Sequence, residues 1–262
     1  MRTTQKLTHF FLWTLFLCLC NITAHAQEHL HKVLFVGNSY TYYNSMPQLF
    51  AAMVEHSLPG HKVETKFIGG GGATLEKHWE VGQVQEALKD GGWDFVVLQE
   101  QSMLGADDLT HPDSPKQFFK YAELLHGEIA SSGAETVFFL TWSRKHLKEQ
   151  QIYLTDAYTK IAQKLGSTLA PVGLVWDSLR EDPALELYME DGSHPSVTGS
   201  FVAAMTLAAT IFDVRLNDVP GELYGYEILR GGALSDEKTA LSNLPANQVQ
   251  RIERAVMALM QE

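Results

Sequence analysis

Apolar positions along the chain recur with two different spacings, and these spacings predict its strands and helices. Short runs that are apolar at nearly every position indicate strands buried on both faces, as in a parallel sheet covered on two sides. The clearest run, residues 32–36 (KVLFV), ends at Gly37. The other expected strands are residues 62–68, 94–98 and 135–142, with a short fifth strand within residues 169–176.

Longer segments between these runs carry apolar residues three and four positions apart, which is the spacing of amphipathic helices. The first helix is expected to begin at Ser45, whose hydroxyl suits an N-cap, with Pro47 in its first turn. Residues 217–244 show neither spacing and are expected to form an irregular excursion. Further helices are expected over residues 75–88, 115–131, 148–165 and 197–212, and after Pro245.

Strands that alternate with helices predict right-handed βαβ units and a parallel sheet with helices on both faces. We therefore expect an α/β fold of the flavodoxin-like type, a three-layer α/β/α sandwich around a parallel sheet of about five strands. No internal repeat, low-complexity tract or linker interrupts the pattern. Residues 27–262 are therefore expected to form a single domain.

The first 26 residues differ in composition from the rest of the chain. Arg2 and Lys6 precede an apolar run over residues 10–20, and Ala24-His25-Ala26 is a small-x-small cleavage sequence. We expect residues 1–26 to be a signal peptide that is cleaved after Ala26, so that the protein is periplasmic or secreted. Because the apolar run is short for a bilayer span, no stable membrane insertion is expected after cleavage.

Composition excludes several classes of function. Hydrophobic residues make up 45% of the chain and charged residues 19%, which is typical of a globular protein and not of a disordered one. The formal charge of −11 becomes −13 without residues 1–26, so no nucleic-acid partner is expected. Both cysteines, Cys18 and Cys20, would leave with the signal peptide. We expect no metal and no cofactor, since no metal-ligand or nucleotide-binding signature is present.

Residues suited to acyl transfer follow the predicted strands. In an open parallel sheet, ligands bind beyond the carboxyl ends of the strands. Four kinds of group would lie together there: a hydroxyl, the backbone amides of glycines, side-chain amides and an Asp/His pair. These groups are the nucleophile, oxyanion donors, base and orienting residue that acyl transfer requires. They lie in residues 37–41 (GNSYT), 69–74 (GGGGAT), 99–102 (QEQS) and 191–195 (DGSHP).

In this order, the blocks resemble those of the SGNH hydrolases, the GDSL-like esterase and lipase superfamily, over nearly the whole mature chain. The first block, residues 37–40 (GNSY), has Asn in place of the usual Asp. The resemblance implies that Ser39 is the nucleophile and that the N–H groups of Ser39 and Gly72 donate to the oxyanion. It also implies that His194 takes the proton of Ser39 and that Asp191 fixes the tautomer of His194.

The third block departs from the family pattern. The family places an Asn after the third strand as a further oxyanion donor, whereas this chain has residues 98–102 (LQEQS). The side-chain amide of Gln99 or of Gln101 offers the same N–H donor on a longer stem. We favour Gln99, with Gln101 as the alternative, and a hole with only two donors remains a third interpretation.

Three residues near the predicted rim are candidates for substrate binding. Tyr40 and Trp142 could stack on a sugar ring or fill the core, and Arg144 could contact an acidic substrate or form a surface ion pair. His78, after the glycine loop, could touch substrate or lie on a helix surface. We expect a metal-independent serine esterase that forms an acyl-enzyme. It would remove small acyl groups such as acetyl from an oligosaccharide or a small-molecule ester. The alternative is a non-hydrolytic carbohydrate-binding relative that keeps the pocket.

Overall fold

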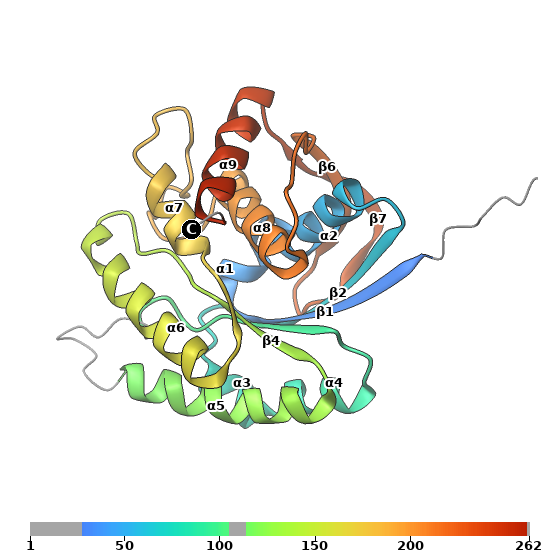
Figure 1. Cartoon of the computed structure of the whole chain (residues 1–262), viewed down its shortest axis with the longest axis vertical. Helices are drawn as coiled ribbons and strands as arrows, with labels where there is room; N and C mark the ends of the chain where they lie inside the picture. The colour runs from blue at the N-terminus through green and yellow to red at the C-terminus, as the bar shows by residue number, and fades with distance from the viewer. Residues whose placement is uncertain (1–27, 105–113, 261–262) are drawn as a thin grey trace, which may run out of the picture.

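The computed structural model describes residues 28–104 and 114–260, and it contains a parallel sheet between two layers of helices (Figure 1). The predicted signal peptide lies outside the described residues. The strand order is β2-β1-β3-β4-β5, which confirms the predicted flavodoxin-like sandwich with a five-stranded parallel sheet. The strands are β1 (His29–Gly37), β2 (His61–Gly69), β3 (Phe95–Leu98), β4 (Glu135–Phe139) and β5 (Thr168–Ala170).

Alternate residues of β1 enter two separate hydrophobic cores, as the continuous apolar run predicts. Val33 and Phe35 pack on one face of the sheet, and Leu34 and Val36 pack on the other. The first face is covered by α2 (Met46–Ser57), α7 (Val172–Leu179), α8 (Val197–Phe212) and α9 (Ala246–Leu259). The second face is covered by α3 (Leu75–Val81), α4 (Gln83–Asp90), α5 (Ser114–Ser132) and α6 (Gln151–Leu165).

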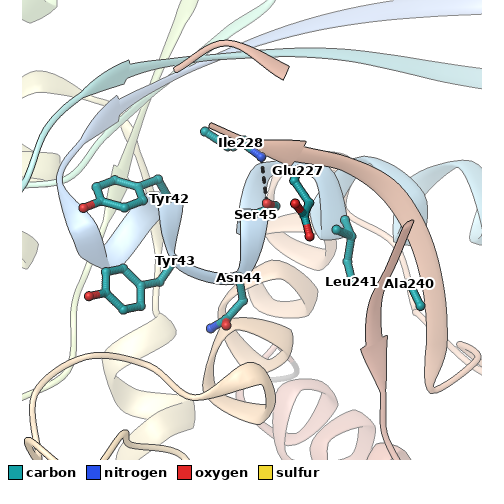
Figure 2. A pocket seen from close by; sticks show the side chains of 8 residues that line it. All are labelled: Tyr42, Tyr43, Asn44, Ser45, Glu227, Ile228, Ala240 and Leu241. Carbon is teal, nitrogen blue, oxygen red and sulfur yellow. Dashed lines mark hydrogen bonds between the residues drawn. The ribbon is translucent and has the colours of Figure 1, made fainter. Parts of the chain in front are cut away.

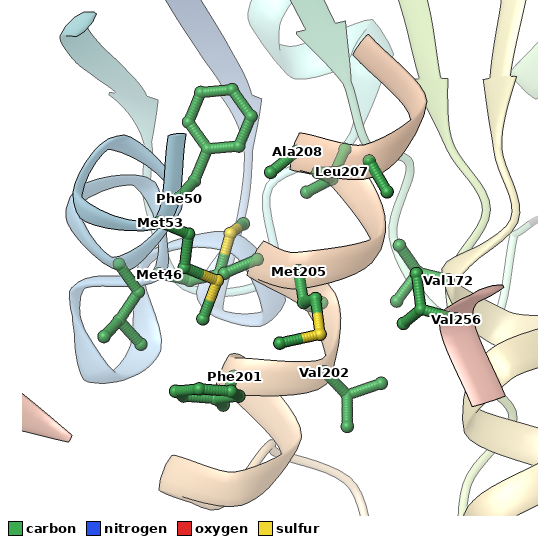
Figure 3. Packing of buried hydrophobic residues seen from close by; sticks show 14 of the residues in the cluster. Met46, Phe50, Met53, Val172, Phe201, Val202, Met205, Leu207, Ala208 and Val256 are labelled. Carbon is green, nitrogen blue, oxygen red and sulfur yellow. The ribbon is translucent and has the colours of Figure 1, made fainter. Parts of the chain in front are cut away.

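The central helix of the first face, α8, is buried on nearly all sides. Its residues from Gly199 to Ala209 are all buried, which explains its composition of small and apolar side chains. Figure 3 shows Met205 of α8 near Met46 and Met53 of α2, and all three side chains belong to the same core. No helix in residues 28–104 or 114–260 combines the length and apolarity that crossing a membrane requires.

Two of the expected elements differ in detail from the sequence prediction. The helix expected over residues 75–88 is two helices, because Gly82 adopts a left-handed conformation with φ +79° between α3 and α4. Residues 169–176 contain the end of β5 and then turn into α7 at Pro171, so the predicted strand is shorter than the apolar run. An apolar run this short fits a buried strand and a buried helix equally well.

The irregular excursion expected over residues 217–244 is instead an antiparallel hairpin of β6 (Glu222–Ile228) and β7 (Leu234–Asn243). Most side chains of β7 are exposed, so its sequence has no apolar alternation from which a strand could be predicted. Ser45 occupies the N-cap position before α2, with Pro47 in the first turn as predicted, but the expected capping by its hydroxyl is wrong. Ser45 makes no capping bond, and its Oγ accepts the backbone N–H of Ile228 in β6 at 2.8 Å.

The strand register brings the candidate blocks to the same level of the sheet. Gly37 at the end of β1 pairs with Gly69 at the end of β2, and Val36 pairs with Leu98 at the end of β3. A Cβ on Gly69 would lie 2.0 Å from the carbonyl oxygen of Gly37, so only glycine allows this approach. The three loops that follow these strands therefore leave the sheet side by side.

Candidate active site

The candidate nucleophile, Ser39, lies where β1 leaves the sheet. It is the first residue of the short helix α1 (Ser39–Tyr42) and is 6% exposed. Asn38 caps this helix through Oδ1, which accepts the N–H of Tyr40 at 3.1 Å, and its Nδ2 donates to the carbonyl oxygen of Ala73 at 3.0 Å. An ionised aspartate could not make the second bond, because a carboxylate only accepts. Asn in the first block therefore joins the nucleophile turn to the glycine loop.

A chain of hydrogen bonds connects Ser39 to the DGSHP block. Ser39 Oγ lies 2.9 Å from Nε2 of His194, and Nδ1 of the same ring lies 2.5 Å from Oδ2 of Asp191. Burial would raise the pKa of Asp191, but hydrogen bonds from the His194 side chain and from the N–H groups of Ser193 and His194 lower it to about 2. Because the ionised carboxylate only accepts, Nδ1 of His194 carries the proton and Nε2 is the acceptor that faces Ser39.

Aromatic rings hold the loop that carries His194. The ring of Tyr43 stacks on the imidazole with centroids 4.5 Å apart. Behind the loop, the hydroxyl of Tyr40 lies 2.7 Å from Oγ of Ser193, and the indole of Trp142 donates to the carbonyl oxygen of Ser193 at 3.1 Å. These contacts fix the backbone from which the imidazole projects.

The same packing corrects the expectation that Trp142 and Tyr40 bind substrate at a rim. Trp142 is fully buried between Tyr40 and Trp176, with ring centroids 4.5 and 3.8 Å away, so it cannot stack on a substrate. Tyr40 is 3% exposed and reaches the cavity beside Ser39 with only a small part of its surface. Position near a strand end does not determine whether an aromatic ring points outward or into the core.

A cavity of about 180 Å³ opens beside Ser39. Within the described part of the chain, the backbone N–H groups of Ser39 and Gly72 make no hydrogen bond, so both are available as donors. Gly72 has φ +67°, and a Cβ there would meet no atom within 4 Å, so backbone conformation rather than space favours glycine. The cavity is lined by Asn38, Ser39, Tyr40, Gly72, Gln101, Ser102, Arg144 and His194.

The two candidate glutamines have different surroundings. Gln99 is fully buried, and its Oε1 accepts both the N–H of Asn38 and the hydroxyl of Thr41 at 2.9 Å. Its Nε2 donates one N–H to the carbonyl oxygen of Glu100, and Gln99 is not among the residues that line the cavity. Gln101 lines the cavity, and its Oε1 accepts the N–H of Met103 at 2.7 Å, so its NH₂ group remains available. Gln99 supports the nucleophile turn, and Gln101 is placed where a side-chain donor is needed.

Glu100, which the sequence analysis did not single out, is buried between the two glutamines. Its carboxylate accepts the N–H of Gln101 at 2.6 Å and the N–H of Leu75, at the start of α3, at 3.2 Å. Burial raises the pKa of Glu100 to about 7, although hydrogen bonds from Gln101 and Leu75 act in the opposite direction. Glu100 therefore joins the end of β3 to the end of the glycine loop. In the sequence, the only indication of this role is that Glu100 is a charged residue between two glutamines.

His78 supports the nucleophile turn from within the protein. Its Nε2–H donates to the carbonyl oxygen of Gly37 at 3.0 Å, and the side chain is buried. Burial lowers the pKa of His78, although the bond to Gly37 raises it. Of the two positions that the sequence left open, the helix surface is wrong, and the side chain lines a cavity beside the glycine loop. Residues 28–104 and 114–260 contain no group of three or more His, Cys, Asp or Glu that could hold a metal ion.

A larger cavity of about 450 Å³ lies beside Tyr43, between the segment after α1 and the β6–β7 hairpin (Figure 2). Two residues that line it, Asn44 and Ser45, both have φ +52°, which non-glycine residues rarely adopt. Asn44 donates to the carbonyl oxygen of Pro195 at 3.1 Å, and Ser45 accepts the N–H of Ile228, drawn as a dashed line in Figure 2. These bonds offset the backbone strain and join the His194 loop to the hairpin.

Comparisons with known proteins find a similar fold in SGNH hydrolases. No protein-family model matches the sequence, and no curated protein matches it. A protein from Slackia heliotrinireducens, provisionally classed as an SGNH hydrolase, is 29% identical with a TM-score of 0.58, over 70% of this chain and 100% of that one.

Two further solved structures share the fold at lower identity. The lipase/acylhydrolase from Enterococcus faecalis is 14% identical with a TM-score of 0.56, over 72% of this chain and 100% of that one. An acetyl-xylooligosaccharide esterase from Geobacillus is 13% identical with a TM-score of 0.53, over 71% of this chain and 95% of that one. The structural neighbours of this chain are thus SGNH hydrolases, the superfamily of GDSL-like lipases and esterases.

Proposed function

We propose that this protein is a serine ester hydrolase that removes small acyl groups, such as acetyl, from a carbohydrate or a related small ester. The observation that carries the proposal is the hydrogen-bonded chain from Ser39 through His194 to Asp191 at the carboxyl ends of the sheet. We further propose that the enzyme acts outside the cytoplasm after cleavage behind Ala26.

The reaction begins with attack of Ser39 Oγ on the ester carbonyl carbon, while Nε2 of His194 takes the hydroxyl proton. Asp191 accepts from Nδ1 and stabilises the imidazolium that forms. Collapse of the tetrahedral intermediate breaks the bond to the leaving oxygen, which receives the proton from His194. Water then attacks the acyl-enzyme, His194 takes one of its protons, and Ser39 is restored as the carboxylic acid departs.

Three donors serve the oxyanion of the tetrahedral intermediate in this proposal: the N–H groups of Ser39 and Gly72 and the NH₂ group of Gln101. We assign the third role to Gln101 rather than to Gln99, because Gln101 lines the cavity, whereas Gln99 is fully buried and bonds to Asn38, Thr41 and Glu100 within the protein. Donors held in place before the reaction stabilise the developing charge without reorganisation.

The dimensions of the site support a small acyl group. The cavity of about 180 Å³ beside Ser39 corresponds to roughly six water molecules of liquid volume. The larger cavity, beside Tyr43, is lined by Glu227, which offers a carboxylate to a polyhydroxylated leaving group. One structural neighbour is named as an acetyl-xylooligosaccharide esterase, and this chain resembles it in fold.

Hydrolysis of p-nitrophenyl acetate by the purified mature chain tests the proposal. Ser39→Ala and His194→Ala are each expected to lower kcat by several orders of magnitude with the fold retained. Ser131→Ala, at an exposed position on α5 on the other side of the sheet, is the matched serine control. A fluorophosphonate probe should label the wild-type chain but not Ser39→Ala. Near wild-type turnover by Ser39→Ala would rule out this mechanism. A wild-type chain that neither turns over nor reacts with the probe would favour the carbohydrate-binding alternative.

A further inference from the structure

Arg144 brings a positive charge into the cavity that contains Ser39. It follows β4 in the chain and lines this cavity together with Ser39, Gln101 and His194. A guanidinium stays protonated throughout the working pH range of an enzyme. Any group that enters the cavity beside the nucleophile therefore meets a permanent cation.

The bonding of Arg144 is incomplete. Within the described residues, its hydrogen bonding is limited to a contact from Nη2 to Oγ of Ser102 at 3.5 Å, at the outer limit of such bonds. Its Nε is buried and has no partner there, and no carboxylate of the described residues lies within 4.0 Å. By contrast, Arg180 pairs with Asp177 at 3.2 Å and Arg251 with Asp182 at 2.7 Å.

An unpartnered donor in a partly buried position is unfavourable unless a ligand satisfies it. The planar guanidinium presents paired N–H groups that match the two oxygens of a carboxylate, so a carboxylate in the cavity can accept from Nη1 and Nη2 rather than from the buried Nε. Ser102, whose hydroxyl already lies beside Arg144, can add a further donor to the same anion. The chain as a whole is acidic, with a formal charge of −11, so an anionic substrate gains its attraction from this local site and not from the overall charge of the protein.

We propose that Arg144 forms a subsite for a carboxylate on the substrate, so that the preferred esters carry an anionic group close to the scissile bond. This inference rests on the proposed esterase function and narrows its substrate class. An acylated sugar acid is a substrate of this kind. Arg144 then acts in recognition, while Ser39, His194 and the oxyanion donors act on the ester.

The test compares charged esters with their neutral counterparts at constant pH and ionic strength. For a carboxylate on the leaving group, the pair is 4-acetoxybenzoate and its methyl ester. For a carboxylate on the acyl group, the pair is monomethyl succinate and dimethyl succinate. The measured quantity is the ratio of kcat/KM between charged and neutral substrate, which cancels a general change in activity.

The wild-type chain is expected to favour the charged member of at least one pair. Arg144→Gln should lower that ratio by roughly tenfold to hundredfold, the effect of losing a charge-assisted hydrogen bond, and Arg144→Lys should retain part of it. Lys145→Gln is the control, because it removes the same charge from the neighbouring residue, which is exposed and pairs with Glu186 at 3.2 Å. A ratio that is unchanged in Arg144→Gln, or that falls equally in Lys145→Gln, would overturn the subsite.

Product binding separates this inference from the esterase proposal. Calorimetric titration with 4-hydroxybenzoate, or with succinate if the acyl pair shows the preference, requires no turnover. Binding to the wild-type chain that is weakened in Arg144→Gln and kept in Lys145→Gln supports the subsite even if no ester is cleaved. Equal binding, or no binding, to the wild-type chain and Arg144→Gln contradicts it even if p-nitrophenyl acetate is a good substrate.

Discussion

The buried carboxylate of Glu100 makes the stability of this fold depend on pH in a direction that can be measured. Glu100 is 2% exposed and accepts backbone N–H groups from Gln101 and Leu75. Burial raises its pKa from an ordinary value of 4.5 to about 7. Between these two values the folded chain binds more protons than the unfolded chain, so the contribution of Glu100 to stability falls as the pH rises. The contribution is complete below about pH 4.5 and is lost above pH 7.

The size of this stability change follows from the difference between the two pKa values. At about 1.4 kcal/mol for each pH unit, the rise from 4.5 to about 7 corresponds to a change on the order of 3 kcal/mol in the free energy of unfolding. Glu100→Gln keeps an oxygen that can accept from Gln101 and Leu75 but cannot ionise. The variant should therefore gain stability relative to the wild-type chain, by up to about 3 kcal/mol, between pH 4.5 and pH 8.

Urea unfolding of the wild-type chain and of Glu100→Gln at several pH values measures this difference directly. Taking the difference at each pH cancels the titration of all groups that the two chains share. Glu86→Gln is the control, since this side chain is 73% exposed, and its difference from the wild-type chain should stay nearly constant. A difference for Glu100→Gln that does not change across this range would refute a buried carboxylate with a raised pKa.

Four further substitutions test the loops around Ser39. Gln101→Ala should lower kcat for p-nitrophenyl acetate roughly 10²–10³-fold with little change in the free energy of unfolding. Gln99→Ala should instead destabilise the chain by roughly 1–3 kcal/mol for each buried donor left unpaired. The reverse pattern would return the donor role to Gln99. Asn38→Asp introduces the aspartate of the SGNH pattern but places a buried carboxyl against the carbonyl oxygen of Ala73. Burial raises the pKa of such a carboxyl, so ionisation at higher pH removes the proton that it could donate to Ala73. Urea unfolding should therefore show a loss of stability that is larger at pH 8 than at pH 5, and an equal loss at both would contradict this. Gly72→Ala meets no neighbouring atom but must keep φ +67°; we expect a loss of about 1–2 kcal/mol together with slower acetate release, and wild-type values in both assays would show that the loop tolerates a side chain.

The sequence alone was sufficient for the elements whose physics is local or repetitive. A central strand such as β1 is buried on both faces, so its apolar run is continuous and is recognisable without any partner strand. Residues three apart in a turn lie close together, so Asp191 and His194 could be paired from their spacing, and the structure places them 2.5 Å apart. Chain order also placed the candidate blocks after strands, because parallel strands end on one side of the sheet.

The tertiary structure alone decided which side chains face the cavity and which support it. Gln99 and Gln101 have the same functional group, and only the contacts of Gln99 with Asn38 and Thr41 show that it is already engaged. Trp142 looks like a rim residue in sequence, yet it is buried because the His194 loop packs over it. In each case the outcome depends on residues far away in the chain.

The hairpin and the turn before α2 show the same limit. Ser45 has the chemistry of an N-cap, but a distant strand supplies Ile228 as a hydrogen-bond donor, and the backbone adopts a left-handed conformation instead. Local preferences amount to about 1 kcal/mol, so a tertiary hydrogen bond and its surrounding packing can override them. Sequence patterns therefore predicted which loops carry the candidate catalytic residues. The direction in which each side chain points was decided by the packing of segments distant in the chain.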